Sequence, residues 1–214
     1  MRVILFGGTG MVGQGVLREC LLDSDVDGVL AVGRGPLGVA HPKLTELRHA
    51  DFTDFSTVAT ELTGYDACFF CLGVSSVGRS AQAYEHVTYD FTLAAARVLA
   101  EVNPGSVFGY VSGAGTDGGA AWAKVKKRVE DDVIALPLRG YAFRPGYIQP
   151  RHGVRPKVRW YRWVYAALTP VYPLLARLLP RFTTTTGQLG RAMLSVAKHG
   201  SEVTRLESVD INRR

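Results

Sequence analysis

Three glycines spaced as G-x-x-G-x-x-G near the start of the chain constrain its fold more than any other feature. An apolar run over residues 2–6 precedes them, and apolar residues at helical spacing follow. A strand, a glycine-rich turn and a helix in this order are the context in which such glycines bind a dinucleotide. They allow a sharp turn, close approach to a pyrophosphate, and tight packing of the helix on the sheet. The residues expected to hold the cofactor in this turn are Gly7, Thr9, Gly10, Met11, Val12 and Gly13.

Apolar runs alternate with helical patterns along most of the chain. Strands are expected near residues 3–6, 28–32, 44–47, 67–72, 106–111 and 141–143, with a last short strand within 203–209. Helices are expected near residues 11–22, 80–101, 120–135 and 188–198. Repeated strand–helix–strand units imply parallel strands with right-handed crossovers. The predicted fold class is therefore α/β, a Rossmann-like doubly wound parallel sheet with a small C-terminal helical lobe.

The pattern loosens after Gly146, where five prolines interrupt residues 149–186. We expect residues 1–148 to form an NAD(P)-binding core, 149–186 a helical substrate-side lobe or lid, and 187–214 a helix and strand that return to the core.

Residues 157–165 interleave four aromatic residues with three cations. The apolar run that follows is too short and too often broken by proline to span a bilayer. A lid or a homodimer face is the favoured interpretation, and peripheral membrane contact through residues 157–182 stays open. Nucleic-acid binding is not expected, because proteins that stack bases place their aromatic residues on a sheet or barrel.

The three cysteines predict a reducing compartment rather than a disulfide framework. Cys68 and Cys71 lie in an expected buried strand, where residues three apart point to opposite faces, so they can neither bridge nor share a metal. No metal site is expected. The first residues lead directly into a core strand instead of a signal peptide, which predicts a cytoplasmic protein.

The end of the second expected strand bears on the choice of cofactor. An NAD site of this type places an acidic residue there, about 20 residues beyond the glycines, to bind the adenosine ribose. This chain has Val32-Gly33-Arg34, with no acid and an arginine. Because a guanidinium pairs with a 2′-phosphate, NADP(H) is favoured over NAD(H). A solvated turn residue is the alternative interpretation of Arg34.

Five short motifs at the ends of expected strands give the chain its family resemblance. They are the glycine turn of residues 7–13, Ala50-Asp51-Phe52, Cys71-Leu72-Gly73, Tyr110-Val111-Ser112-Gly113-Ala114 and Phe143-Arg144-Pro145-Gly146. In their order and spacing the sequence resembles the short-chain dehydrogenase/reductase superfamily. Within it, the chain is most similar to the atypical epimerase-like, Tat-interacting-protein-like and nitrogen-metabolite-repressor-like branch.

The resemblance implies a role for each matching position. Asp51 and Phe52 would lie against the adenine, and Leu72 and Gly73 along the ribose and pyrophosphate. The residues implied beside the nicotinamide are Pro145, Gly146 and Ile148. Ser112 would supply the hydroxyl that holds a substrate carbonyl, and Lys126 would hold the nicotinamide ribose.

The resemblance also implies a catalytic tyrosine four residues before the lysine, on the same helical face. This chain has Trp122 at that position. An indole only donates a hydrogen bond and does not titrate in a useful range, so it cannot transfer a proton as a phenol does. Tyr84, Tyr89 and Tyr147 are candidate substitutes, and core or pocket-wall roles are the competing interpretation of each.

Two functional hypotheses follow from these observations. The first is an NADP(H)-dependent oxidoreductase acting on a small carbonyl or alcohol, with Ser112, Trp122 and Lys126 in its site. The second is a non-catalytic NADP(H)-sensing regulator or scaffold protein.

Overall fold

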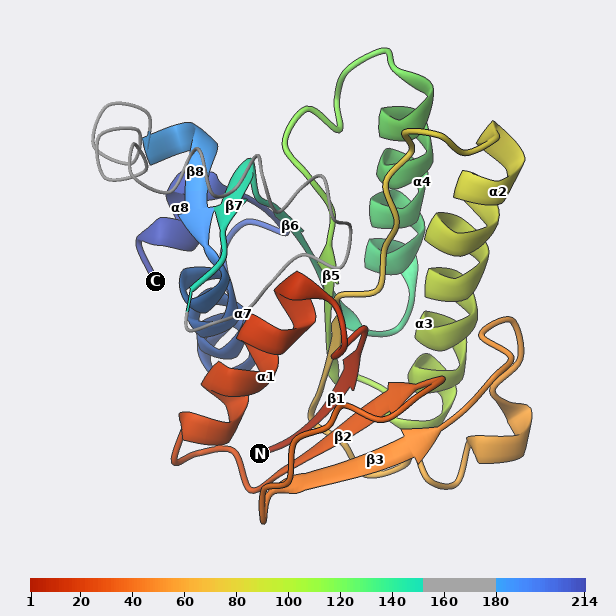
Figure 1. Ribbon diagram of the computed structural model, residues 1–214, viewed down its shortest axis with the longest axis vertical. Helices are drawn as coiled ribbons and strands as arrows, with labels where there is room; N and C mark the ends of the chain where they lie inside the picture. Colours follow the sequence, from red (N-terminus) through yellow and green to blue (C-terminus); the bar gives the residue numbers. More distant parts are fainter. Residues whose placement is uncertain (152–179) are drawn as a thin grey trace.

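The protein is built around one parallel sheet, which is visible in the computed structural model (Figure 1). The structure describes residues 1–151 and 180–214. The seven strands of the sheet run in the order β3-β2-β1-β4-β5-β6-β9. Their bounds are β1 (Arg2–Phe6), β2 (Gly28–Gly33), β3 (Leu44–Arg48), β4 (Ala67–Phe70), β5 (Val107–Val111), β6 (Arg139–Arg144) and β9 (Arg205–Glu207). This topology confirms the predicted doubly wound α/β fold, whose strand order reverses between β1 and β4.

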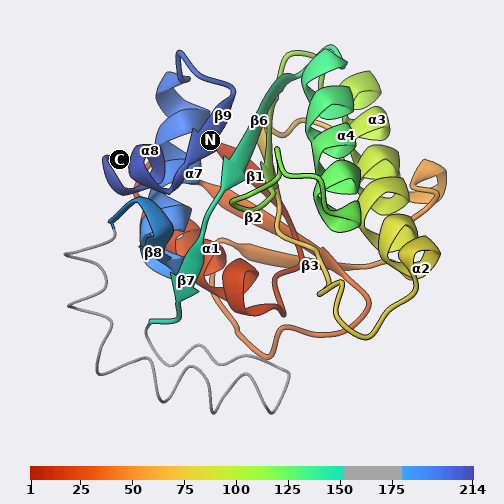
Figure 2. The same cartoon turned by 90° about the horizontal axis from the view of Figure 1, so that it is seen from above.

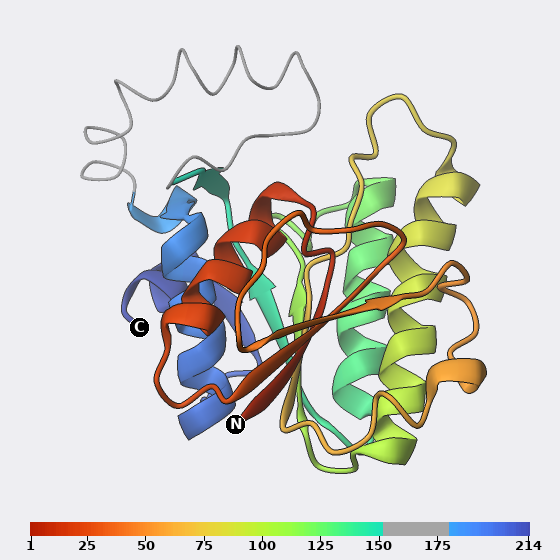
Figure 3. The same cartoon turned by 60° about the horizontal axis from the view of Figure 1, so that its bottom comes forward.

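Helices cover both faces of the sheet (Figures 2 and 3). One face carries α1 (Met11–Leu22), α7 (Thr186–His199) and α8 (Ser208–Asn212). The other carries α2 (Ala81–Glu85), the π-helical turn η2 (His86–Asp90), α3 (Phe91–Val102) and α4 (Ala121–Ala135). Two short 3-10 turns, η1 (Ser56–Val58) and η3 (Pro180–Phe182), complete the described helices.

Alternate residues of each strand enter opposite hydrophobic cores. Val3 and Leu5 of β1 pack on the α1 and α7 side, whereas Ile4 and Phe6 pack on the α3 and α4 side. The C-x-x-C pair obeys the same rule. Cys68 belongs to the core under α3 and α4, and Cys71 packs against the opposite core. The predicted opposition of the two cysteines is confirmed, and both are free.

Capping side chains mark the start of α2 and of α7. Ser80 caps α2 by accepting the Ala83 N–H at 3.1 Å, and α2, η2 and α3 together fill the expected helix of residues 80–101. A capping box begins α7, where the Thr185 hydroxyl accepts the Gln188 N–H at 3.1 Å and the Gln188 side chain accepts the Thr185 N–H at 3.1 Å.

The structure confirms the last expected strand and adds a small second sheet. The strand expected within residues 203–209 is β9, and it ends at Glu207 because α8 begins at Ser208, behind a capping box formed by Glu207 and Asp210. The sequence did not predict β7 (Tyr147–Gln149) and β8 (Thr183–Thr185), which pair in parallel. The helical lobe predicted within 149–186, with its aromatic and basic segment, lies mainly outside the described residues. Within the part of the chain that is described, no helix has the length and apolarity needed to cross a membrane.

Candidate functional site

The glycine turn between β1 and α1 is shaped by contacts that leave no room for side chains. Gly7 has a φ of +78°, and a Cβ there would lie 2.6 Å from the backbone nitrogen of Leu72. A Cβ on Gly13 would clash with the carbonyl oxygen of Gly7, and one on Gly10 would lie 3.2 Å from that same oxygen. The Gly10 N–H donates to the Gly7 carbonyl at 2.8 Å and closes the turn. The turn therefore lies directly against the loop after β4.

The N-terminus of α1 opens onto this turn without a capping side chain. Gly10 is the N-cap residue, and the first helical turn over Met11, Val12 and Gly13 contains no acid. Its Gln14 N–H donates to the Gly10 carbonyl at 2.9 Å, and the Gln14 side chain donates to the Thr9 carbonyl at 3.1 Å. The N–H groups that begin a helix have no partner within it and favour an anion. All six residues predicted in this turn are brought together here.

Arg34 follows the last residue of β2 and is exposed. No ion pair within residues 1–151 and 180–214 involves it. The Asp51 carboxylate after β3 accepts the Thr53 N–H at 2.8 Å and the Thr53 hydroxyl at 2.5 Å, and these bonds lower the pKa of Asp51. Phe52, expected at the adenine, is 2% exposed, and its ring packs in the core against Phe6.

The loops after β4 and β6 approach the same edge of the sheet. Leu72 is half-buried, and Gly73 is exposed with no atom within 4 Å of a Cβ built on it. Pro145 is buried, and its carbonyl accepts the Ala114 N–H at 2.9 Å. The Gly146 N–H donates to the Ser208 hydroxyl at 2.9 Å, and half-buried Ile148 lies on β7.

Ser112 and Lys126 meet at the end of β5. The Lys126 Nζ on α4 donates to the Ser112 carbonyl at 2.7 Å. Thr116, which the sequence did not single out, donates its hydroxyl proton to the Gly113 carbonyl at 2.5 Å. Its oxygen also lies 3.2 Å from the Ser112 Oγ. Because a hydroxyl has one proton, Ser112 is the donor within this pair, and its Oγ presents acceptor capacity to a ligand.

Burial dominates the electrostatics of Lys126. Loss of solvent around the ammonium lowers the pKa of Lys126 to about 8, although Glu130, one helical turn further along α4, partly opposes the shift. The Nζ also lies 5.8 Å from the centre of the Tyr110 ring. Half-buried Trp122 lies one turn before Lys126, and its ring is 3.7 Å from a Cβ built on Gly115. The indole therefore packs toward the loop that carries Thr116.

The three candidate tyrosines are engaged elsewhere. Tyr84 is 4% exposed, and burial raises the pKa of its phenol. Tyr89 donates to the Asp132 carboxylate at 2.5 Å, a bond that raises the pKa of Tyr89. Tyr147 donates to the Gln149 side chain at 2.8 Å. Lys126 is thus the titratable side chain that the structure brings to Ser112.

A buried charge network, missed by sequence reasoning, lies behind these residues. Arg144 is 4% exposed and forms hydrogen bonds of 3.0, 3.1 and 2.6 Å with the fully buried Glu130 carboxylate. It also contacts Asp117 at 2.6 Å and Glu207 at 3.2 Å. These carboxylates raise the pKa of Arg144 further above its already high range. The available signal was an arginine directly after the apolar residues 141–143 of an expected strand.

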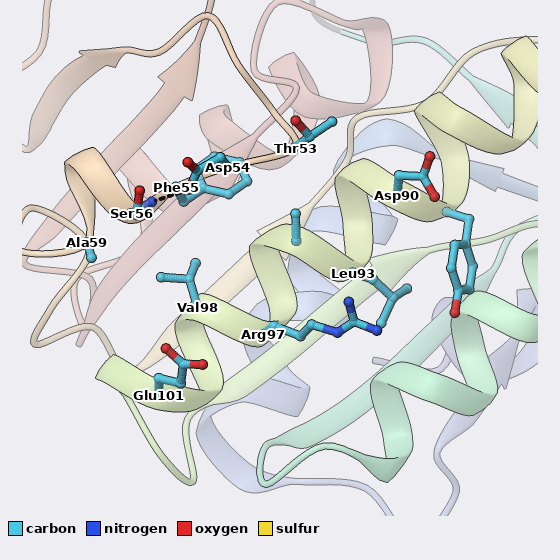
Figure 4. A pocket seen from close by; sticks show the side chains of 12 residues that line it. Thr53, Asp54, Phe55, Ser56, Ala59, Asp90, Leu93, Arg97, Val98 and Glu101 are labelled. Carbon is cyan, nitrogen blue, oxygen red and sulfur yellow. Dashed lines mark hydrogen bonds between the residues drawn. The ribbon is translucent and has the colours of Figure 1, made fainter.

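Two surface pockets lie away from the glycine turn. One, of about 550 Å³, lies between η1 and α3, and Arg97, Val98 and Glu101 project from α3 among its lining residues (Figure 4). The other, of about 760 Å³, is lined by residues near both ends of the C-terminal segment, including His199 and Arg213. Tyr89, a candidate substitute for the catalytic tyrosine, lines the first pocket, and neither pocket is lined by a residue of the glycine turn, Ser112 or Lys126.

Comparison with known proteins shows which family the chain resembles. A family model described as the NAD dependent epimerase/dehydratase family matches residues 3–144. A curated relative, leucinostatins biosynthesis cluster protein T of Purpureocillium lilacinum, is 25% identical and covers 89% of this chain and 82% of its own length.

Two solved structures show the same fold. An oxidoreductase of the short-chain dehydrogenase/reductase family from Burkholderia thailandensis has a TM-score of 0.71 and 16% identity, covering 98% of this chain and 92% of its own. The Bordetella bronchiseptica enzyme WbmF in complex with NAD⁺ has a TM-score of 0.70 and 16% identity, covering 99% of this chain and 76% of its own.

Proposed function

The chain belongs to the NAD dependent epimerase/dehydratase family, and from that premise we propose that it is an NADP(H)-dependent oxidoreductase of a small carbonyl or alcohol. The glycine turn is the single observation that carries this proposal. Its three glycines let backbone segments approach more closely than a Cβ would allow, directly before an uncapped helix N-terminus. Both features suit the pyrophosphate of a dinucleotide.

The other predicted residues would hold the remaining parts of the cofactor. Leu72 and Gly73 would line the ribose and pyrophosphate, and Asp51 would border the adenine, with the buried Phe52 packed behind it. The loop of Pro145, Gly146 and Ile148 would border the nicotinamide. When bound, the reduced nicotinamide supplies a hydride to a carbonyl carbon, and the carbonyl oxygen then needs a proton.

At the chemical end, Ser112 and Lys126 would bind and orient the reacting group. The Lys126 ammonium has three protons, one of which is donated to the Ser112 carbonyl. The Ser112 Oγ, with its own proton directed to Thr116, would accept a hydrogen bond from a substrate hydroxyl. Trp122 would provide an apolar wall, not a proton, so we expect slow turnover.

Arg34 supports NADP(H) over NAD(H), since it is exposed and free of ion pairs within the described part of the chain. We expect Arg34→Ala to weaken NADPH binding by about 1.5–3 kcal/mol while barely changing NADH binding, if the contact is charge-assisted. Fluorescence titration of the purified protein with each reduced cofactor measures both. Equal losses for the two cofactors would remove the NADP(H) assignment.

The engagement of Tyr84, Tyr89 and Tyr147 favours a second candidate function. With Trp122 in place of the family's phenol, the protein would be a non-catalytic NADP(H)-sensing regulator or scaffold whose contacts change with occupancy. A panel of small aldehydes and ketones with NADPH separates the two functions. NADPH binding without turnover of any of them favours the regulator, whereas turnover that depends on Lys126 favours the enzyme.

A further inference from the structure

A second arginine lies beside Arg34 at the corner of the sheet where β2 and β3 end. The register of these parallel strands pairs Gly33 with Arg48, the last residue of β3. The next residue, His49, donates its N–H to the Gly33 carbonyl at 3.0 Å and keeps the strands together to their ends. Gly33, the register partner of Arg48, has no side chain. No side chain therefore stands between Arg48 and the backbone that leads into Arg34.

The side chain of Arg48 belongs to the sheet face that carries α1. Residues two apart on a strand share a face, so Leu44, Glu46 and Arg48 point the same way. Leu44 packs against the core on the α1 side. The Glu46 carboxylate accepts the Leu37 N–H at 3.0 Å, which shows that side chains on this face reach the loop after β2. Arg48 lies two residues nearer the carboxyl edge than Glu46.

The same loop returns to the glycine turn. A side-chain carbon of Leu37 lies 3.0 Å from a Cβ built on Gly8. The glycine turn, the loop after β2 and the end of β3 therefore converge at one corner of the carboxyl edge. The adenosine end of a dinucleotide held by that turn would meet this corner.

The nearby carboxylates are occupied by local hydrogen bonds. Glu46 accepts from Leu37, Asp51 accepts from Thr53, and Asp54 accepts the Ser56 N–H at 2.8 Å. Within residues 1–151 and 180–214, neither Arg34 nor Arg48 forms an ion pair, and both are exposed. The guanidinium groups of Arg34 and Arg48 therefore have no ion-pair partner among the described residues. The end of β2 also lacks the acidic residue that binds the adenosine ribose in an NAD site.

We propose that Arg48 is a second specificity-determining residue, which binds the 2′-phosphate of NADP(H) together with Arg34. The inference rests on the proposed NADP(H) function and deepens it. A guanidinium pairs with phosphate through two parallel N–H bonds, so two arginines can engage one phosphate from two sides.

Binding of NADPH, NADH and 2′,5′-ADP to the wild type, Arg48→Ala and Arg48→Lys tests the proposal. We expect Arg48→Ala to weaken NADPH and 2′,5′-ADP about tenfold, equivalent to ~1.4 kcal/mol, and to leave NADH unchanged. Arg48→Lys should recover part of the loss, because it keeps the charge but not the bidentate geometry. Arg139→Ala is the matched control, since Arg139 is exposed and begins β6 at the opposite edge.

Three other results would contradict the role of Arg48 or the preference for NADP(H). If Arg48→Ala behaves like Arg139→Ala while Arg34→Ala still loses NADPH, Arg48 has no part and the NADP(H) function stands. If Arg48→Ala weakens NADPH and NADH equally, Arg48 contacts the adenosine and not the phosphate. A wild type that binds both cofactors equally, or neither, overturns the preference for NADP(H) and this inference with it.

Discussion

The two halves of the carboxyl edge are built by different means. The nucleotide half, from the glycine turn to the end of β3, depends on missing side chains, an uncapped helix terminus and exposed arginines. The chemical half, around Ser112 and Lys126, depends on buried charges and hydroxyl groups that bind one another. In the first half, the N–H groups that begin α1 have no capping side chain, whereas in the second half the polar side chains already bind one another. The proposed cofactor site and the proposed chemical site can therefore be tested separately.

The largest expected effect lies in the nucleotide half. Gly13→Ala places a Cβ against the Gly7 carbonyl, so the turn must shift, and we expect NADPH affinity to fall by at least about a hundredfold, or ~2.7 kcal/mol. Gly119→Ala is the control, because a Cβ there meets no atom within 4 Å. Calorimetric titration measures both variants. Retained affinity in Gly13→Ala would show that the turn does not bind the cofactor.

The chemical half should instead be sensitive to loss of a buried charge. Arg144→Met leaves the fully buried Glu130 without its main partner, and we expect a loss of about 3–5 kcal/mol in the free energy of unfolding. Arg205 contacts the same carboxylate at 3.3 Å from a more exposed position, so Arg205→Met should cost about 1 kcal/mol or less. Urea denaturation compares the two. If both variants lose a similar free energy of unfolding, burial of the Arg144–Glu130 pair does not explain the stability of this half.

The sequence predicted the geometry of the glycine turn better than the contacts around Ser112 and Lys126, for a physical reason. The glycine turn is a local feature, because its shape follows from neighbours within a few residues. The partners in the chemical half are distant, as in the pairs Lys126 with Ser112 and Arg144 with Glu130. A sequence pattern marks each of these residues as unusual but does not say which residue it contacts.

The same reasoning explains the errors in the fold. The central strands and helices were predicted because their apolar periodicity is local and repeated. The three-residue strands β7 and β8 are too short to show a period, and they pair across more than 30 residues of chain. The last expected strand, within residues 203–209, is by contrast confirmed as β9, which ends where Glu207 and Asp210 form the capping box of α8.

Trp122→Tyr tests whether the chemical half lacks only a proton donor. The change restores a phenol one helical turn before Lys126, and we expect NADPH-dependent reduction of reactive carbonyls to rise about 10²-fold, the lower range of general-acid effects. Lys126→Met in the same background should remove the gain. NADPH affinity must be unchanged for the comparison to hold. Wild-type turnover already within about 1–10³ s⁻¹ on any carbonyl would refute an impaired site.

The last prediction concerns the dependence of stability on the titration of Lys126. Its pKa is about 8 in the folded protein and 10.5 in the unfolded chain. Between these values the unfolded state binds more protons than the native state, so this residue makes stability rise with pH. Below pH 8 both states carry the charge, and its burial cost is fully present. Above pH 10.5 both states are neutral, and that cost is gone.

Lys126→Met isolates this contribution, because it keeps a chain of similar length without the charge. We expect the wild type to gain stability relative to the variant as the pH rises from 8 toward 10.5, and urea denaturation of both proteins across that range measures the difference. The subtraction cancels the tyrosines and other lysines that titrate in the same range. A constant difference would mean that the Lys126 ammonium is well solvated, which would place the chemical half as open to water as the nucleotide half. If the stability difference between the two proteins changes only between pH 8 and 10.5, the Lys126 ammonium is buried next to Ser112. The chemical half is then shielded from water before any ligand binds.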